Sequence, residues 1–387
     1  MTAGQAETPR RTLATAVANE TGRAVRKARR AARKARRLAR ELLYHPRFHL
    51  RRLLHRRAES TLKDQRKDAG FVLYRILGND LEPRHESRQT LRNLEFILTN
   101  EGPLERCEKR WILNRIHDPA SERDLVALIE AAGHSYLRIP FEPHVYRTID
   151  VDWQRFGGPR FFESPAFLAL DPIAQARARA SALRLKNLYA INNNGARNAA
   201  IHDGRAVADW VLPWDGNCFL TADAWRSIVA SVDANRIYDY HVVPMARILS
   251  NDELLTGETR FVARDEPQLI FHRTARETFD PEIPYGRRPK IELLSRLGLR
   301  GPWDRWATDP WDIWPARSSP DRYLFNGSAG WVARLSSGRP DLEQGQRSDA
   351  NRADARNHAI VRTLAMLDEK CAAAAIEAPQ GCPSARG

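Results

Sequence analysis

Long apolar runs are missing from this chain of 387 residues. No stretch of about 18 apolar residues occurs, so no transmembrane helix is expected. The N-terminal region also lacks the apolar stretch of a signal peptide, and none is expected. The composition, 42% hydrophobic and 28% charged, suits a soluble globular protein with a sizeable core.

Cysteine is almost as scarce. The four cysteines form neither a CxxC pair nor a spacing typical of zinc sites, and they stand at Cys107, Cys218, Cys371 and Cys382. Four cysteines in a chain of this length do not make a disulfide framework, which favours a reducing compartment.

Acidic residues are scarce only near the N-terminus. Residues 1–70 hold 20 Lys/Arg and 6 Asp/Glu, which accounts for the whole net charge of +14. The rest of the chain is neutral, so the basic character belongs to an arm and not to the folded body. This asymmetry predicts an arm, residues 1–68, that meets an anionic surface.

The arm contains two basic stretches. Residues 23–45 consist mainly of strong helix formers, and residues 47–57 continue the pattern after Pro46. Apolar residues lie near one face on each side of the proline, which is typical of a helix at a membrane surface. We therefore predict that residues 23–57 contact an anionic membrane. A solvated charged helix is the alternative, and a transit peptide fits less well because the first serine is Ser60.

The body alternates strands with helices from about Ala69. Hydrophobic patterns predict strands at 71–77, 110–116 and 136–141, with a helix at 86–100 and another that Ser121 is expected to cap. Strands that alternate with helices of 10–15 residues indicate βαβ units and therefore a parallel sheet.

An insertion of about 142–187 interrupts this alternation and ends in an Ala/Arg/Leu-rich helix near 173–189. A helix at 196–207 and a buried strand at 208–214 follow. The remaining expected elements are a helix at 222–232, strands near 239–248 and 267–272, and a last helix at about 350–372. The predicted organisation is the arm, an α/β domain at 69–273 and an α-rich C-terminal extension at 274–387.

Three sequence features of the α/β domain occur in the same order in a known protein family. Asp118 follows the second strand, the run NNNGARNAA at 192–200 opens a helix, and Asp215-Gly216-Asn217 follows a buried strand. In this order they resemble the nucleotide-binding half of a GT-A glycosyltransferase of the family 2-like type. The resemblance covers about half of the chain, from Phe71 to Arg273. It implies a Rossmann-like, mainly parallel sheet flanked by helices.

The resemblance also implies roles for single residues. Asp118 matches the Asp that bonds the nucleotide base. The residues that match the segment under the donor nucleotide are Asn194, Gly195, Arg197 and Asn198. Asp215 and Asn217 match the two ends of the DxD motif, which holds a divalent metal on the diphosphate of the donor.

A metal is expected at this motif because a sugar nucleotide leaves as a diphosphate with concentrated negative charge. Mg²⁺ or Mn²⁺ with oxygen ligands neutralises such a group. Asn217 replaces the second acid of the motif, so the site needs another ligand or holds the metal less tightly. His272, at the end of a late strand, is the candidate third ligand; a structural histidine is the alternative.

A catalytic base is expected downstream of the metal motif. In inverting members an Asp or Glu deprotonates the acceptor hydroxyl, and the candidates here are Glu266 and Asp265, with Glu266 preferred. A solvated turn is the alternative for both. The basic run at Arg287, Arg288 and Lys290 could neutralise phosphate, although surface solvation explains it equally well.

The sequence thus predicts a metal-dependent glycosyltransferase of the hexosyltransferase type. It would move a sugar from a nucleotide-sugar donor to a glycan or lipid-linked acceptor in polysaccharide synthesis, in the cytoplasm at the inner face of the membrane. A capsule-type sugar-phosphate transferase is one alternative, and a nucleic-acid-binding or non-catalytic glycan-binding protein is an alternative of another class. A nucleic-acid partner is not expected, because the arm has almost no aromatic residues for stacking and the body is neutral.

Overall fold

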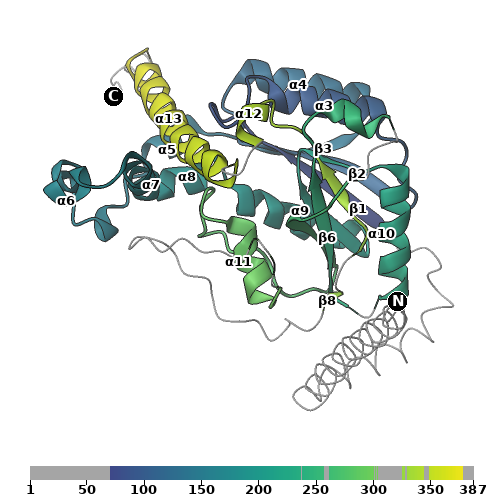
Figure 1. Ribbon diagram of the computed structural model, residues 1–387. Helices are drawn as coiled ribbons and strands as arrows, with labels where there is room; N and C mark the ends of the chain where they lie inside the picture. The colour runs from purple at the N-terminus through teal and green to yellow at the C-terminus, as the bar shows by residue number, and fades with distance from the viewer. Residues whose placement is uncertain are drawn as a thin grey trace, which may run out of the picture. The chain divides into compact units, whose positions relative to one another are not determined.

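The fold was analysed in a computed structural model of the chain (Figure 1). The structure describes residues 70–377, apart from 237, 257–260, 300, 302, 304–324, 327–328 and 344–347. All described residues fall in one compact unit, Lys67–Gly387. The predicted arm and its membrane contact lie outside the described residues.

The first elements alternate between strand and helix as predicted. They are β1 (Phe71–Leu77), α3 (Gln89–Asn100), β2 (Cys107–Asn114), α4 (Pro119–Ala131) and β3 (Ser135–Ile139). The three strands pair in parallel, with β1 between β2 and the next strand of the sheet. Apolar runs such as FVLYRIL in β1 suit this position, because strands of a covered parallel sheet are buried on both faces.

The order in which strands are added to the sheet reverses at β1. After β3 the chain forms the helical segment 143–190, then α9 (Asn193–Val207), and returns as β4 (Trp210–Asp215) on the other side of β1. The strand order is therefore β3-β2-β1-β4 in this half. The gap between the carboxyl ends of β1 and β4 is a topological switch point, where open α/β sheets bind ligands.

The second half of the sheet contains antiparallel pairs. Its elements are β5 (Cys218–Phe219), α10 (Ala222–Ala234), β6 (Tyr240–Arg247), η3 (Asn251–Leu254), β7 (Asp265–His272), α11 (Pro289–Arg296), β8 (Phe325–Asn326), β9 (Val332–Arg334) and α12 (Pro340–Glu343). β7 runs antiparallel to both β4 and β6, whereas β8 and β9 pair in parallel with β6. The prediction of an α/β fold with a mostly parallel sheet between helices is confirmed (Figure 1).

Helices cover both faces of the sheet. Successive side chains of a strand point to opposite faces, so alternate residues of β1 pack against different helices. Phe71 and Leu73 of β1 belong to a core with residues of α10, and Leu77 to one with residues of α3 and α4. Val72 and Tyr74, between them in sequence, pack with Ala196 and Ala200 of α9 on the other face.

The helical segment packs on the last helix. It comprises α5 (Pro143–Arg147), η1 (Trp153–Arg155), η2 (Pro159–Glu163), α6 (Pro165–Leu168), α7 (Pro172–Ala182) and α8 (Arg184–Ala190), and it lies beside α13 (Ser348–Glu377) (Figure 1). Tyr146 and Ala190 form a core with Ile360 and Leu364 of α13. None of the helices in the described part of the chain combines the length and apolar character needed to cross a bilayer.

Candidate functional site

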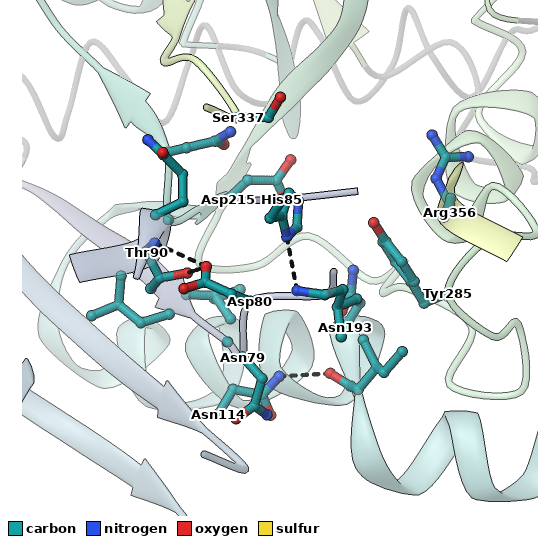
Figure 2. Close-up of a pocket in the computed structure, with 18 of the residues that line it drawn as sticks. Asn79, Asp80, His85, Thr90, Asn114, Asn193, Asp215, Tyr285, Ser337 and Arg356 are labelled. Atoms are coloured by element: carbon teal, nitrogen blue, oxygen red, sulfur yellow. Dashed lines mark hydrogen bonds between the residues drawn. The ribbon is translucent and has the colours of Figure 1, made fainter. Parts of the chain in front are cut away.

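A cavity of about 240 Å³ opens at the switch point. We call it the central cavity. The turn after β1, the end of β4, and the starts of α9 and α11 all line it. Arg334 of β9 also lines it, so residues beyond 274 contribute to the same site. Figure 2 shows Asp80 and Thr90 on one side of this cavity, with Tyr285 and Arg356 on the other.

Asp215 lines the central cavity. It ends β4 opposite Ile76 of β1, and the chain then turns at Gly216. A Cβ at Gly216 would lie 2.4 Å from the carbonyl oxygen of Ile76, so only glycine fits where the turn passes over β1. The position of the Asp215 carboxylate is therefore set by close contact between β1 and the turn.

Three donors surround this carboxylate. Arg197 Nη2 donates to Oδ1 at 2.6 Å, while Gln268 Nε2 and Lys290 Nζ reach Oδ2 at 2.9 and 3.4 Å. Burial alone would raise the pKa of Asp215. Lys290, Arg197 and Arg334 outweigh that effect and hold the pKa well below its usual range. Asp215 is therefore ionised and already neutralised by the protein.

Most residues of the predicted nucleotide segment support the site from behind. Asn194 Nδ2 donates to the carbonyls of Asp280 and Pro289 at 2.7 and 3.0 Å, and Asn198 exchanges two hydrogen bonds with the backbone of Phe279. Together they hold the segment 279–289 against α9. Gly195 leaves room for the Asn192 side chain, since a Cβ there would lie 2.0 Å from Asn192 Oδ1.

Arg197 is the member of the predicted set that lines the central cavity. Its guanidinium bridges Asn194 Oδ1 at 2.9 Å and Asp215, and it lies over the Phe279 ring. The structure thus brings Arg197 and Asp215 together. Asn194, Gly195 and Asn198 line neither this cavity nor the one described below, and the contacts above show them holding the backbone around the site.

His272 does not lie with the other two expected metal ligands, Asp215 and Asn217, which both line the central cavity. β7 runs antiparallel to β4, and His272 pairs in register with Trp210 at the opposite end of β4. Five residues at about 3.3 Å each separate Trp210 from Asp215, so His272 lies about 16 Å from the cavity along the strand. The prediction of His272 as third ligand is wrong because the late strand reverses direction. His272 Nδ1 instead bonds Thr274 Oγ1 at 2.7 Å.

A divalent cation does not fit the remaining donors. Asn217 lines the cavity, but both Asp215 oxygens are engaged by Arg197, Gln268 and Lys290. No group of three or more His, Cys, Asp or Glu side chains that could hold a metal occurs among the residues that the structure describes. Mg²⁺ is usually held by one or two carboxylates together with substrate phosphates. Here the Asp215 carboxylate is paired with Arg197 and Lys290, whose charges repel a cation, so the lining suits the expected metal poorly.

The two candidate bases have different surroundings. Glu266 lines the central cavity and lies 3.5 Å from Lys290 Nζ. Asp265, the first residue of β7, forms an ion pair at 2.8 Å with Arg247 of β6 and is not among the lining residues. This follows from the alternation of side chains along β7. Of the two candidate bases, Glu266 is therefore the one that faces the central cavity.

A second cavity, of about 330 Å³, lies beside the first and shares Gly78, Asn79, Asp80 and Thr90 with it. We call it the β2 cavity, because residues after β2 line it. Asp118 and Ser121 are among them. Asp118 caps α4 by accepting from Ser121 N at 2.9 Å and Oγ at 2.6 Å, so the expectation that Ser121 is the cap is wrong. These hydrogen bonds lower the pKa of Asp118.

The turn after β1 was not among the predicted site residues. Asp80 accepts from Thr90 N at 2.9 Å and Oγ1 at 2.6 Å, and burial raises the pKa of this carboxyl (Figure 2). Asn79 donates to the Arg115 carbonyl and accepts from His117 N, which ties the ends of β1 and β2 together. The signal was present, because Gly78-Asn79-Asp80 follows the first strand of a parallel sheet.

Comparison with known proteins adds little. The chain matches no known protein family, and no curated protein matches it. A crystal structure of TarS 1-349 from S. aureus is similar with a TM-score of 0.30 and 9% sequence identity, over 77% of this chain and 65% of that chain. This chain therefore spans slightly less than two thirds of that structure. Such a similarity is too low to assign an activity, which has to come from the site.

Proposed function

We propose that the chain is a glycosyltransferase that uses a nucleotide-sugar donor. The observation that supports this most is the pair of adjoining cavities, with shared lining residues, at the carboxyl ends of β1, β2 and β4. A donor has a flat base, a ribose, a diphosphate and a sugar in line, and it needs an elongated site of this kind. The switch point is where an α/β sheet offers one.

The two cavities suit different parts of the donor. Asp118, Asp80 and Ser121 give the β2 cavity hydrogen-bonding groups for a base and ribose. The central cavity contains Arg197, Lys290 and Arg334, which suit the diphosphate. The sugar and the acceptor hydroxyl then meet near Glu266.

In this arrangement the reaction is a direct displacement at the anomeric carbon. The acceptor oxygen forms a bond to that carbon while the bond to the phosphate oxygen breaks, and the leaving diphosphate takes the electron pair. Glu266 accepts the proton of the acceptor hydroxyl. Lys290 and Arg334 stabilise the negative charge that develops on the leaving group.

Screening of nucleotide sugars tests this proposal. Thermal unfolding of the full chain would be followed with UDP-, GDP- and CMP-sugars, because a ligand that binds only the native state raises the melting temperature. A hit is then incubated with glycan and lipid-linked acceptors, and the products are analysed. No shift with any of the three classes would remove the proposal. A phosphodiester product would replace it with a sugar-phosphate transferase.

A further inference from the structure

We propose that the central cavity holds the diphosphate of its ligand with Lys290, Arg334 and the starts of α9 and α11, without a divalent cation. This inference rests on the proposed function for the identity of the ligand. It departs from the metal-dependent site that the Asp215-Gly216-Asn217 motif predicts.

Lys290 supplies the first part of the site. It is only 2% exposed, and it lines the cavity from the first turn of α11. Its ammonium has two acidic neighbours, Asp215 at 3.4 Å and Glu266 at 3.5 Å, and both distances exceed those of close charged hydrogen bonds. An ammonium has three donors. Lys290 can therefore bond a phosphate oxygen while it stays near both carboxylates.

Arg334 supplies the second part of the phosphate site. It ends β9 opposite Cys218, beside the turn at Gly216, and Leu335 N fixes this position by donating to the Asn217 carbonyl at 2.9 Å. Within the described ranges no carboxylate lies within ion-pair distance of its guanidinium, which nevertheless lines the cavity. Asp215 and the other acids attract it only from further away. A guanidinium that lines a cavity and has no close carboxylate among the described residues suits a bidentate contact with phosphate.

Two helix starts face the same space. α9 begins at Asn193 and α11 at Pro289, and both residues line the cavity. In neither helix does the N-cap side chain bond the first turn: Asn192 and Arg288 adopt left-handed backbone angles and make no cap hydrogen bond. Of the first-turn residues that carry an N–H group, Asn193 and Lys290 line the cavity, so their backbone N–H groups can meet a ligand, and the helix dipoles favour an anion there.

The charge of the lining matches such an anion. Five cationic side chains of the described residues line the central cavity: Arg197, Arg288, Lys290, Arg334 and Arg356. Three carboxylates oppose them, namely Asp80, Asp215 and Glu266. The excess is positive without any metal, and His85 adds nothing at neutral pH because burial lowers its pKa to about 3. A metal would add charge where the protein already supplies it.

Calorimetric titration of the full chain tests the proposal with inorganic pyrophosphate and UDP, each in EDTA and in Mn²⁺. We expect the same affinity, within about twofold, under both conditions, and no heat when Mn²⁺ is added alone. Lys290→Met and Arg334→Met should each weaken pyrophosphate binding in EDTA at least tenfold. Lys290→Arg and Arg334→Lys should restore most of it. Arg226→Met, at an exposed position on α10, is the matched control and should change nothing.

The outcomes separate the two proposals. Binding of UDP only in Mn²⁺ would overturn the metal-free site and leave the glycosyltransferase proposal standing. Unchanged affinity in both methionine variants would also overturn it. If nucleotides and pyrophosphate fail to bind under either condition, both proposals fall. Circular dichroism checks folding, and if Lys290→Met does not fold, Arg334→Met decides the matter because Arg334 has no close ion pair to lose within the described part of the chain.

Discussion

Arg197 Nη2 lies 2.6 Å from Asp215 Oδ1, and this ion pair joins the first turns of α9 to the end of β4. Arg197 is nearly buried, whereas Asp215 opens to the central cavity. The pair has two consequences. It fixes the carboxylate at the switch point, and it leaves Asp215 little capacity to bind a metal.

Removal of either partner should destabilise the fold. Breaking a buried pair leaves an uncompensated charge, so Arg197→Met and Asp215→Asn should each lower the free energy of unfolding by about 3 kcal/mol. The double variant should lose less than the sum of the two. Urea denaturation measures all three. Arg226→Met, from the exposed pair with Asp223, is the control and should cost under about 1 kcal/mol. Additive losses would show that the pair is not coupled.

Substitution of Asn198 distinguishes a structural role of this residue from a contact with the donor. Its side chain exchanges two hydrogen bonds with the Phe279 backbone, at 2.8 and 3.0 Å. We expect Asn198→Ala to lower the free energy of unfolding by about 2 kcal/mol because it leaves backbone groups unpaired. Donor affinity, measured well below the melting temperature, should fall no more than about threefold. A large loss of affinity with unchanged stability would return Asn198 to the donor site.

The sequence was sufficient for the elements that depend on local pattern. β1 was predicted at its observed bounds, because FVLYRIL is a continuous apolar run followed by turn residues. The start of α4 was harder, since Asp118 and Ser121 are both good caps three residues apart. Only the structure shows that Asp118 accepts from Ser121.

The remaining errors come from long-range pairing. Nothing in residues 265–272 indicates that β7 runs antiparallel to β4, and this direction decides that Glu266 reaches the cavity while His272 does not. Arg334 could not be predicted as a site residue for the same reason. Its place beside Asp215 depends on the pairing of β9 with both β5 and β6, which are far away in sequence.

Acid should destabilise the protein through His241. This side chain is fully buried in β6 against Trp210, and its two ring nitrogens have no hydrogen-bond partner among the residues that the structure describes. Burial lowers the pKa of His241 from 6.5 to about 3. The unfolded chain therefore binds the extra proton first, and stability is lost as pH falls from about 6.5 toward 3. Between pH 7 and pH 5 the loss from this group is about 2 kcal/mol.

Substitution isolates this contribution. His241→Phe keeps an aromatic ring of similar size and removes the titration, so its loss of stability between pH 7 and pH 5 should be smaller than that of the native chain by the same amount. Urea denaturation at pH 7, 6 and 5 gives the comparison. His358→Gln, at an exposed position of α13, should follow the native curve. Identical curves for His241→Phe and the native chain would contradict the assignment.

The basic arm remains a prediction from the sequence. Residues 1–70 carry all the net charge of +14, and each basic residue near an anionic membrane contributes up to about 1 kcal/mol. The full chain should therefore sediment with anionic vesicles, and a truncated chain that begins at Ala69 should not. High salt should weaken binding. If both forms sediment equally, the contact lies in the body.

Glu266 is the sharpest test of the proposed chemistry. It lines the central cavity next to Lys290, whereas Asp265, one residue earlier, forms an ion pair with Arg247. Glu266→Gln keeps the shape and removes the proton acceptor, so turnover should fall about 10²–10⁴-fold. Donor affinity should stay within a few fold, because the phosphate contacts are untouched. Asp265→Asn is the adjacent control. It should weaken the link to β6 and lower stability slightly while turnover stays within about threefold. Turnover, donor affinity and melting temperature would be measured for both variants. If Glu266→Gln keeps native turnover, the proton goes elsewhere or the reaction retains the anomeric configuration, and the displacement proposed here does not occur.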